Sequence, residues 1–111
     1  MIEIKDIQTD FQQHLDSFFV ALTLGETGST SSSLFYMNFF KAIPDDLDEQ
    51  PLPNFAIYFR QKGLFVLEKM DKKVITDFLA CFIASFSDLK WDVALERLLT
   101  YFDWEYENFQ A

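Results

Sequence analysis

The sequence holds two side chains of the kinds that carry out nucleophilic chemistry: its only histidine, His14, and its only cysteine, Cys81. A nucleophile needs a base within hydrogen-bond reach, so His14 would have to meet Cys81 or a serine after folding. His14 follows Asp10 by four residues, which is the spacing of an ordinary surface pair on a helix. Cys81 lies in the most apolar stretch of the chain, and thiols in such surroundings are usually inert. We therefore expect no catalytic residues and no enzyme activity.

Three other motifs lack groups that a cofactor or metal site needs. Residues 25–30 (Gly-Glu-Thr-Gly-Ser-Thr) invite comparison with phosphate-binding loops, but they lack the Lys-Ser/Thr pair, and Glu26 would repel an anion. One His and one Cys cannot fill a structural zinc site. The acidic run 45–49 lacks the glycine and the final glutamate of a calcium loop. We expect no cofactor and no metal, and we interpret residues 25–33 as a flexible connector.

Two acidic segments are candidates for binding a partner protein. One is the acidic run 45–49, and the other is the C-terminal segment 101–109, which interleaves aromatic rings with carboxylates. Trp and Tyr are common anchors in interfaces, and neighbouring carboxylates pair with Lys or Arg of a partner. The alternative for the C-terminal segment is that its rings pack in the core. The predicted partner-binding residues are Asp45, Asp46, Asp48, Glu49, Asp103, Trp104, Glu105, Tyr106 and Glu107.

The pattern of apolar residues predicts the elements that would position these side chains. In 6–24 they recur at spacings of three and four, as on an amphipathic helix: Ile7, Phe11, Leu15, Phe18 and Leu22. Residues 34–41 predict a strand, with a short helix as the alternative, and alternation in 54–70 predicts a β-hairpin. Residues 72–86 and 88–102 predict two helices, the first apolar nearly all round. We expect one α+β domain, residues 1–111, of order α-β-β-β-α-α, with a three-stranded antiparallel sheet packed by helices on one face.

Composition narrows the range of partners. The chain has 111 residues with 18 acidic against 9 basic side chains, a net charge of −9. Such a surface repels phosphate backbones and anionic membranes, so we expect no direct nucleic-acid or membrane binding. It attracts basic protein surfaces. The single cysteine and the charged N-terminus indicate a cytoplasmic protein. Fourteen Phe, four Tyr and two Trp are hard to bury completely in a domain of this size.

In size, charge and expected element order the chain resembles phage-encoded anti-defence proteins (anti-CRISPR-like or anti-restriction-like) and bacterial immunity or antitoxin proteins. This resemblance implies a small acidic inhibitor, acting as a nucleic-acid mimic that masks a basic surface of its partner. The alternative is an acidic secretion-type chaperone or adaptor, which would form a homodimer and bind a hydrophobic peptide. Binding by the inhibitor should weaken steeply with ionic strength, whereas binding by the chaperone should not.

Overall fold

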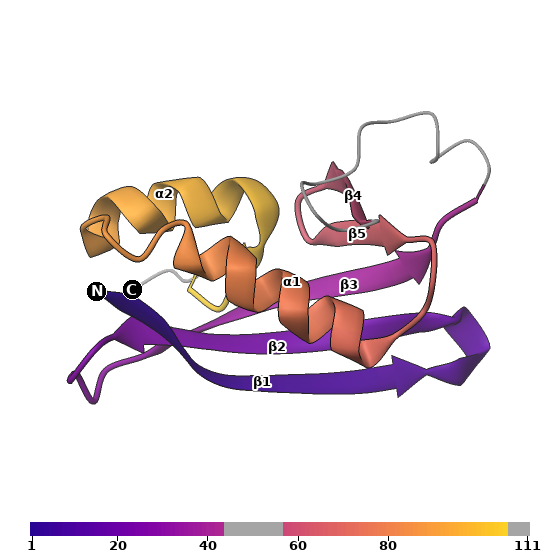
Figure 1. Cartoon of the computed structure of the whole chain (residues 1–111), viewed down its shortest axis with the longest axis horizontal. Coiled ribbons are helices and arrows are strands. Elements are labelled where there is room, and N and C mark those ends of the chain that lie inside the picture. Colours follow the sequence, from indigo (N-terminus) through magenta and orange to yellow (C-terminus); the bar gives the residue numbers. More distant parts are fainter. Residues whose placement is uncertain (44–56, 107–111) are drawn as a thin grey trace.

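The computed structural model describes residues 1–43 and 57–106, and in these ranges one mixed β-sheet carries two helices (Figure 1). Three long strands come first in the chain: β1 (Ile2–Gln12), β2 (Ser17–Glu26) and β3 (Ser33–Lys41). A short 3-10 helix, η1 (Gln13–Leu15), joins β1 to β2. The later elements are β4 (Ile57–Gln61), β5 (Leu64–Leu67), α1 (Lys72–Ala84), α2 (Trp91–Tyr101) and β6 (Asp103–Trp104).

β3 is the central strand of the sheet. One edge pairs with β2 in antiparallel register, from Ser33 opposite Leu24 to Phe40 opposite Ser17. The other edge is shared, because residues 38–41 pair in parallel with β5 while a two-residue stretch pairs with β6. The strand order is β1-β2-β3-β5-β4, with β6 beside β3. The N-terminal hairpin, the β4–β5 hairpin and the end of α2 therefore all meet at β3.

The predicted helix over 6–24 is wrong, because these residues form β1, η1 and β2. Ile7 opposes Leu22 and Phe11 opposes Phe18 across this hairpin, so the residues that fitted a helix face share one face of a sheet. A spacing of four is two pleats of a strand as well as roughly one helical turn. The spacing therefore fits both structures and could not decide between them.

The predicted three-stranded antiparallel sheet and the order α-β-β-β-α-α are also wrong. The sheet has six strands in the described ranges, and it is mixed because β3 and β5 run parallel. The predicted strand at 34–41 is β3, and the predicted hairpin is β4 and β5, whose described part begins at Ile57. The predicted helices at 72–86 and 88–102 are α1 and α2, each a few residues shorter. The fold remains α+β, but its N-terminal part is sheet.

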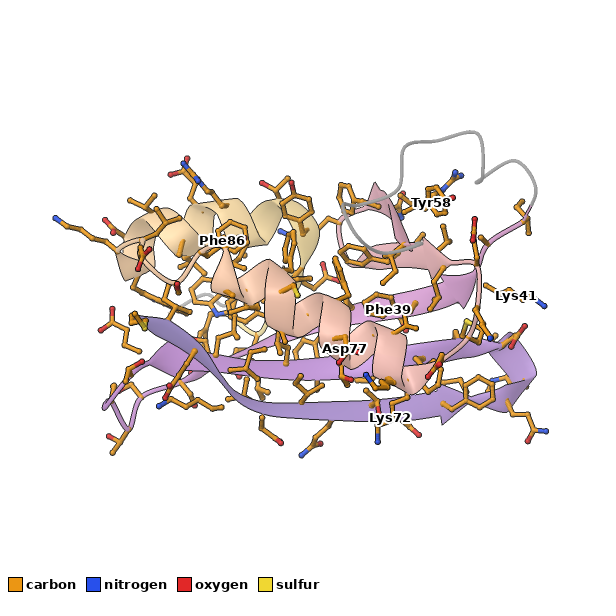
Figure 2. The ribbon with its side chains drawn as sticks, viewed as in Figure 1. Phe39, Lys41, Tyr58, Lys72, Asp77 and Phe86 are labelled. Atoms are coloured by element: carbon orange, nitrogen blue, oxygen red, sulfur yellow. The ribbon has the colours of Figure 1, made fainter. Side chains whose placement is uncertain are left out.

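Both helices lie on the same face of the sheet, where they cover an aromatic core (Figures 1 and 2). Phe78 of α1 contacts Phe39 and Phe65 of the sheet, with ring centroids 6.2 and 5.9 Å apart. Phe102, which follows α2, contacts Phe35 at 6.4 Å. These rings are at most 2% exposed. Burying each contributes roughly 1.5–3 kcal/mol to stability, so the core is concentrated on one side of the sheet.

Gly63 lies where β5 begins, and it joins three elements. Its carbonyl accepts a hydrogen bond from the N–H of Asn38 on β3 (2.8 Å), and its own N–H donates to the carbonyl of Tyr101 at the end of α2 (2.7 Å). Its φ of 77° is left-handed, and a Cβ here would collide with the carboxylate of Asp103. Gly28, in the β2–β3 turn, has a similar φ of 83° but no atom within 4 Å of the Cβ position.

We predict that Gly63→Ala lowers the free energy of unfolding more than Gly28→Ala does. A left-handed backbone costs a non-glycine residue about 1–2 kcal/mol at either position, and only Gly63→Ala adds the collision with Asp103. Urea unfolding followed by circular dichroism measures both. In a double-mutant cycle, Asp103→Ala should recover the excess loss of Gly63→Ala and leave Gly28→Ala unaffected. Equal losses in the two single variants would contradict the assigned contact.

Candidate protein-docking surface

One face of the sheet has no helix over it among the described elements, because α1 and α2 both pack on the other face. Residues that oppose each other directly across neighbouring strands share a face, so the register identifies the side chains here. Over β1, β2, β3 and β6 they include Asp6, Gln8, Asp10, Phe19, Ala21, Thr23, Tyr36, Asn38, Phe40 and Asp103. We call this set the open sheet face.

Aromatic rings occupy the centre of the open sheet face. Phe19 of β2 and Tyr36 of β3 stack, with ring centroids 5.8 Å apart and planes 18° apart. Both are half-buried, as is Phe40 at the end of β3. Rings held in this way offer a large contact area with little side-chain freedom left to lose on binding. They are suited to anchoring a partner protein.

Carboxylates flank the rings on two sides. Asp6 and Asp10 lie on β1, at one edge of the sheet, and Asp103 lies on β6; all three are exposed. The side-chain amide of Gln8 donates to Asp6 at 3.2 Å, and that of Gln12 donates to Asp10 at 2.7 Å. Glu3, opposite Gly25, lies on this side as well, and Lys5, at the irregular step between Ile4 and Asp6, forms an ion pair with it at 2.8 Å. No Lys or Arg occupies a paired position of the open sheet face in the described ranges. The face is therefore negative at its rim and aromatic at its centre.

The basic side chains gather instead near the helices. All nine Lys and Arg fall within the described ranges, and Figure 2 shows Lys72 at the start of α1. Lys73 forms an ion pair with Asp77 one turn later (2.6 Å), and this hydrogen bond and charge raise the pKa of Lys73. Five of the nine lie on or beside the two helices: Lys69, Lys72, Lys73, Lys90 and Arg97. Acidic residues lie near the helices as well, so that side of the sheet carries both signs of charge: Asp71, Asp77, Asp88, Asp92 and Glu96.

Four residues of the predicted C-terminal binding segment are described, and they lie on both sides of β6. Asp103 opposes Tyr36 and belongs to the open sheet face. Trp104 opposes Phe35 and stacks on it from the helix side, with ring centroids 6.4 Å apart and planes 17° apart. Tyr106 meets Trp104 edge-on at 5.3 Å and is 49% exposed. The segment is extended, and its alternation divides it between core and surface.

Glu105 ties this segment to β3. Its N–H donates to the carbonyl of Leu34, and its Oε1 accepts from the N–H of Leu34, both at 3.1 Å. The structure therefore brings Asp103 to the open sheet face and gives Glu105 and Trp104 contacts within the fold. A partner-binding role for the predicted residues stays a prediction. The remaining five lie outside the described residues: Asp45, Asp46, Asp48, Glu49 and Glu107.

The residues first considered for chemistry lie on separate elements. His14 is in η1 and Cys81 is on α1, and both are exposed. Cys81 is exposed because α1 buries only the side that faces the sheet, so the prediction of a helix apolar nearly all round does not describe its environment. Within the described residues no three His, Cys, Asp or Glu side chains gather as metal ligands. Neither described helix is long and apolar enough to cross a bilayer.

The uncovered face of the sheet is not accessible over β4 and β5. Tyr58 and Val66 lie on this side of the sheet and are only 5% and 7% exposed. The hydroxyl of Tyr58 donates to Oε1 of Glu68 at 3.1 Å. Burial, followed by this hydrogen bond and the negative charge of Glu68, raises the pKa of Tyr58. The accessible part of the face therefore lies over β1, β2 and β3.

Most of the open sheet face was missed in the sequence. Asp6, Asp10 and Phe19 were assigned to a helix, and Tyr36 to a strand without a role. The missed signal is a strict alternation in β2, in which buried residues on the helix side alternate with accessible ones: Val20, Leu22 and Leu24 against Phe19, Ala21 and Thr23. Such alternation is typical of a strand with one covered face.

We predict that Tyr58 ionises above the ordinary tyrosine pKa and that Glu68→Gln lowers its pKa part of the way back. The folded state holds this proton more tightly than the unfolded chain does. The stability from this contact is therefore present below the ordinary pKa and is lost as the pH rises through the raised one. Tyrosinate absorbance during alkaline titration of both proteins measures the shift. Identical titration curves for the two proteins would show that Glu68 does not raise the pKa of Tyr58.

We predict that Trp104→Ala lowers the free energy of unfolding by about 3 kcal/mol, because it removes the ring that stacks on Phe35. Trp104→Phe, which keeps a ring at this position, should lose less than half of that. Urea unfolding of both variants measures the losses. If Trp104→Ala unfolds at the same urea concentration as the unaltered chain, the ring does not contribute to the core.

A family model described as Immunity protein 8 matches residues 1–109, which is nearly the whole chain. No curated protein and no solved structure gives a match. The description of the family model agrees with an uncovered surface suited to binding another protein. Immunity proteins bind a partner toxin. The chain belongs to the Immunity protein 8 family.

Proposed function

We propose that this protein neutralises a bacterial toxin without catalysis, by covering a basic surface of the toxin with its open sheet face. Lys and Arg of the toxin, such as those that would hold a nucleic acid, meet Asp6, Asp10 and Asp103. The stacked rings of Phe19 and Tyr36 contact apolar surface between them. Inhibition of this kind requires only that the toxin's working surface is occupied.

One observation carries the proposal. A ring pair, three exposed carboxylates and an absence of Lys and Arg from the paired positions coincide on a face that no described helix covers. Solubility alone would not require the acidic residues to flank half-buried aromatic rings. The predicted contacts Asp45, Asp46, Asp48, Glu49 and Glu107 stay candidates for binding the same partner.

Charges and rings contribute differently to such a complex. Exposed ion pairs add only about 0–1 kcal/mol each, but a complementary field raises association rates by roughly 10- to 1000-fold at low salt. Aromatic side chains supply most of the contact energy when they are enclosed by a partner. The carboxylates should therefore act mainly on the association rate, and the rings mainly on the dissociation rate.

We predict that removing the three carboxylates slows association with the toxin by about tenfold at low salt and flattens its salt dependence. The toxin is first recovered by affinity capture and identified by mass spectrometry. Stopped-flow rates are then measured for the triple variant Asp6→Asn, Asp10→Asn, Asp103→Asn across a range of ionic strength. The matched control changes three exposed acids elsewhere by the same total charge: Asp16→Asn, Asp88→Asn and Glu96→Gln.

The control variant should keep most of the rate, and both variants should be checked for unchanged urea unfolding. Equal slowing in the two would assign the effect to net charge and contradict docking at this face. Salt-insensitive binding of a hydrophobic peptide by a stable dimer would favour the chaperone alternative. As a cellular readout, cells that express the toxin should survive with the unaltered chain and should need more of the triple variant for the same protection.

A further inference from the structure

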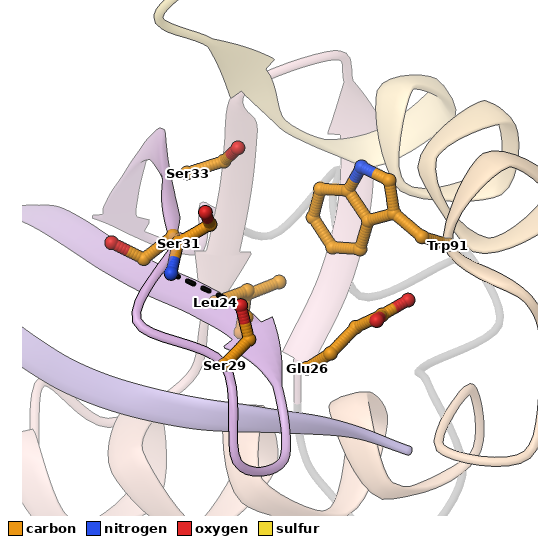
Figure 3. A pocket seen from close by; sticks show the side chains of 8 residues that line it. Leu24, Glu26, Ser29, Ser31, Ser33 and Trp91 are labelled. Carbon is orange, nitrogen blue, oxygen red and sulfur yellow. Dashed lines mark hydrogen bonds between the residues drawn. The ribbon is translucent and has the colours of Figure 1, made fainter.

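A cavity of about 230 Å³ lies at the end of the β2–β3 hairpin, beside the first residue of α2. Figure 3 shows the Trp91 ring on one side of it, the serine-rich turn on the other, and the Glu26 carboxylate below the ring in that view. The lining residues are Leu24, Gly25, Glu26, Ser29, Ser31, Ser32, Ser33 and Trp91.

The side of Trp91 that faces the core is in contact with another ring. Its ring meets Phe35 of the core at 6.4 Å with an interplanar angle of 67°, and the ring is half-buried. The opposite wall is held by a tight turn, in which the Ser31 N–H donates to the Ser29 hydroxyl at 3.1 Å. At Gly25 a Cβ would stand 2.7 Å from the Ser31 carbonyl, so the strand and the turn approach as closely as glycine permits. The cavity is therefore built by the fold.

The lining chemistry favours a cation. A tryptophan face attracts Lys and especially Arg, and an exposed carboxylate beside it adds opposite charge. Within the described residues no Lys or Arg pairs with Glu26, whereas Glu3 already holds Lys5 at 2.8 Å. The Ser29 carbonyl already accepts from the Lys5 ammonium at 3.3 Å, and the other serine hydroxyls and backbone carbonyls are acceptors for the five N–H groups of a guanidinium.

Two other occupants fit less well. An anion would meet Glu26 and no lining cation. An anion at the start of α2 would also meet Asp92, whose carboxylate accepts a hydrogen bond from the Val93 N–H at 3.0 Å. A cofactor or drug-sized ligand usually takes a pocket of about 300–1,000 Å³, which is larger than this one. A single long side chain is the better match in size.

We infer that this cavity, which we call the arginine socket, receives one arginine side chain of the toxin, with the guanidinium against Trp91 and paired with Glu26. The inference rests on the proposed function and names a second point of contact for the same partner. Phe35, which supports Trp91, also stacks on Trp104. The predicted C-terminal segment therefore connects the arginine socket with Asp103 on the open sheet face.

The test has two arms. In the first, the isolated chain is titrated with N-acetyl-arginine methylamide while the indole N–H signal of Trp91 is followed by NMR. The neutral isostere N-acetyl-citrulline methylamide is the probe control. A saturable shift is expected with the arginine probe alone. It should be lost in Glu26→Gln and kept in Glu96→Gln, which removes the same charge from α2 outside the socket.

The second arm measures the Kd for the captured toxin. Glu26→Gln and Trp91→Leu should each raise it by about tenfold, and Trp91→Phe should raise it less because a ring remains. Unchanged Kd values overturn the inference, as does an arginine shift no larger than the citrulline shift. If the unaltered chain still neutralises the toxin in that case, the proposed function stands without the arginine socket. If the arginine probe alone shifts the Trp91 signal but the chain binds no toxin, the proposed function is overturned. The inference that the arginine comes from a toxin is then overturned as well.

Discussion

The structure depends on a sheet whose three long strands fully bury their large apolar side chains on one face only. Rings from β3, β5, α1 and the end of α2 pack into a single layer, and both helices are needed to cover it. With both helices used on that side, none described remains for the other face of the three long strands. The half-buried rings and exposed carboxylates there follow from this division. A one-sided core leaves a broad, rigid surface, which is what a protein that works by occupying a partner's surface requires.

Parts of this arrangement could be predicted from the sequence, and the reasons for the failures are physical. The β4–β5 hairpin and both helices were found because glycine at 63 and apolar runs of helical length are specific signals. The N-terminal hairpin was missed because Ile7, Phe11, Phe18 and Leu22 satisfy a helix and a strand equally well. The parallel pairing of β3 with β5 joins segments separated by a long stretch of chain, and no local pattern encodes it. The candidate surface was lost with the hairpin, since its face exists only when β1, β2 and β3 lie side by side.

In the folded chain the acidic and basic side chains are not evenly distributed. Asp6, Asp10 and Asp103 stand on the open sheet face beside the accessible rings, whereas five of the nine basic residues lie near the helices. Membership of an immunity protein family makes a toxin the partner, and the proposed docking places that toxin on the open sheet face. The proposed arginine socket lies at the end of the β2–β3 hairpin, beside the first residue of α2.

The most direct test of the account is hydroxyl-radical footprinting of the chain alone and bound to its toxin, read by mass spectrometry at single side chains. The account predicts that oxidation of Phe19 and Tyr36 falls on binding, while Cys81 and Val93, exposed on the two helices, react as before. Protection of the helix residues with unchanged oxidation at Phe19 and Tyr36 would contradict it, because the toxin would then bind the other side of the molecule.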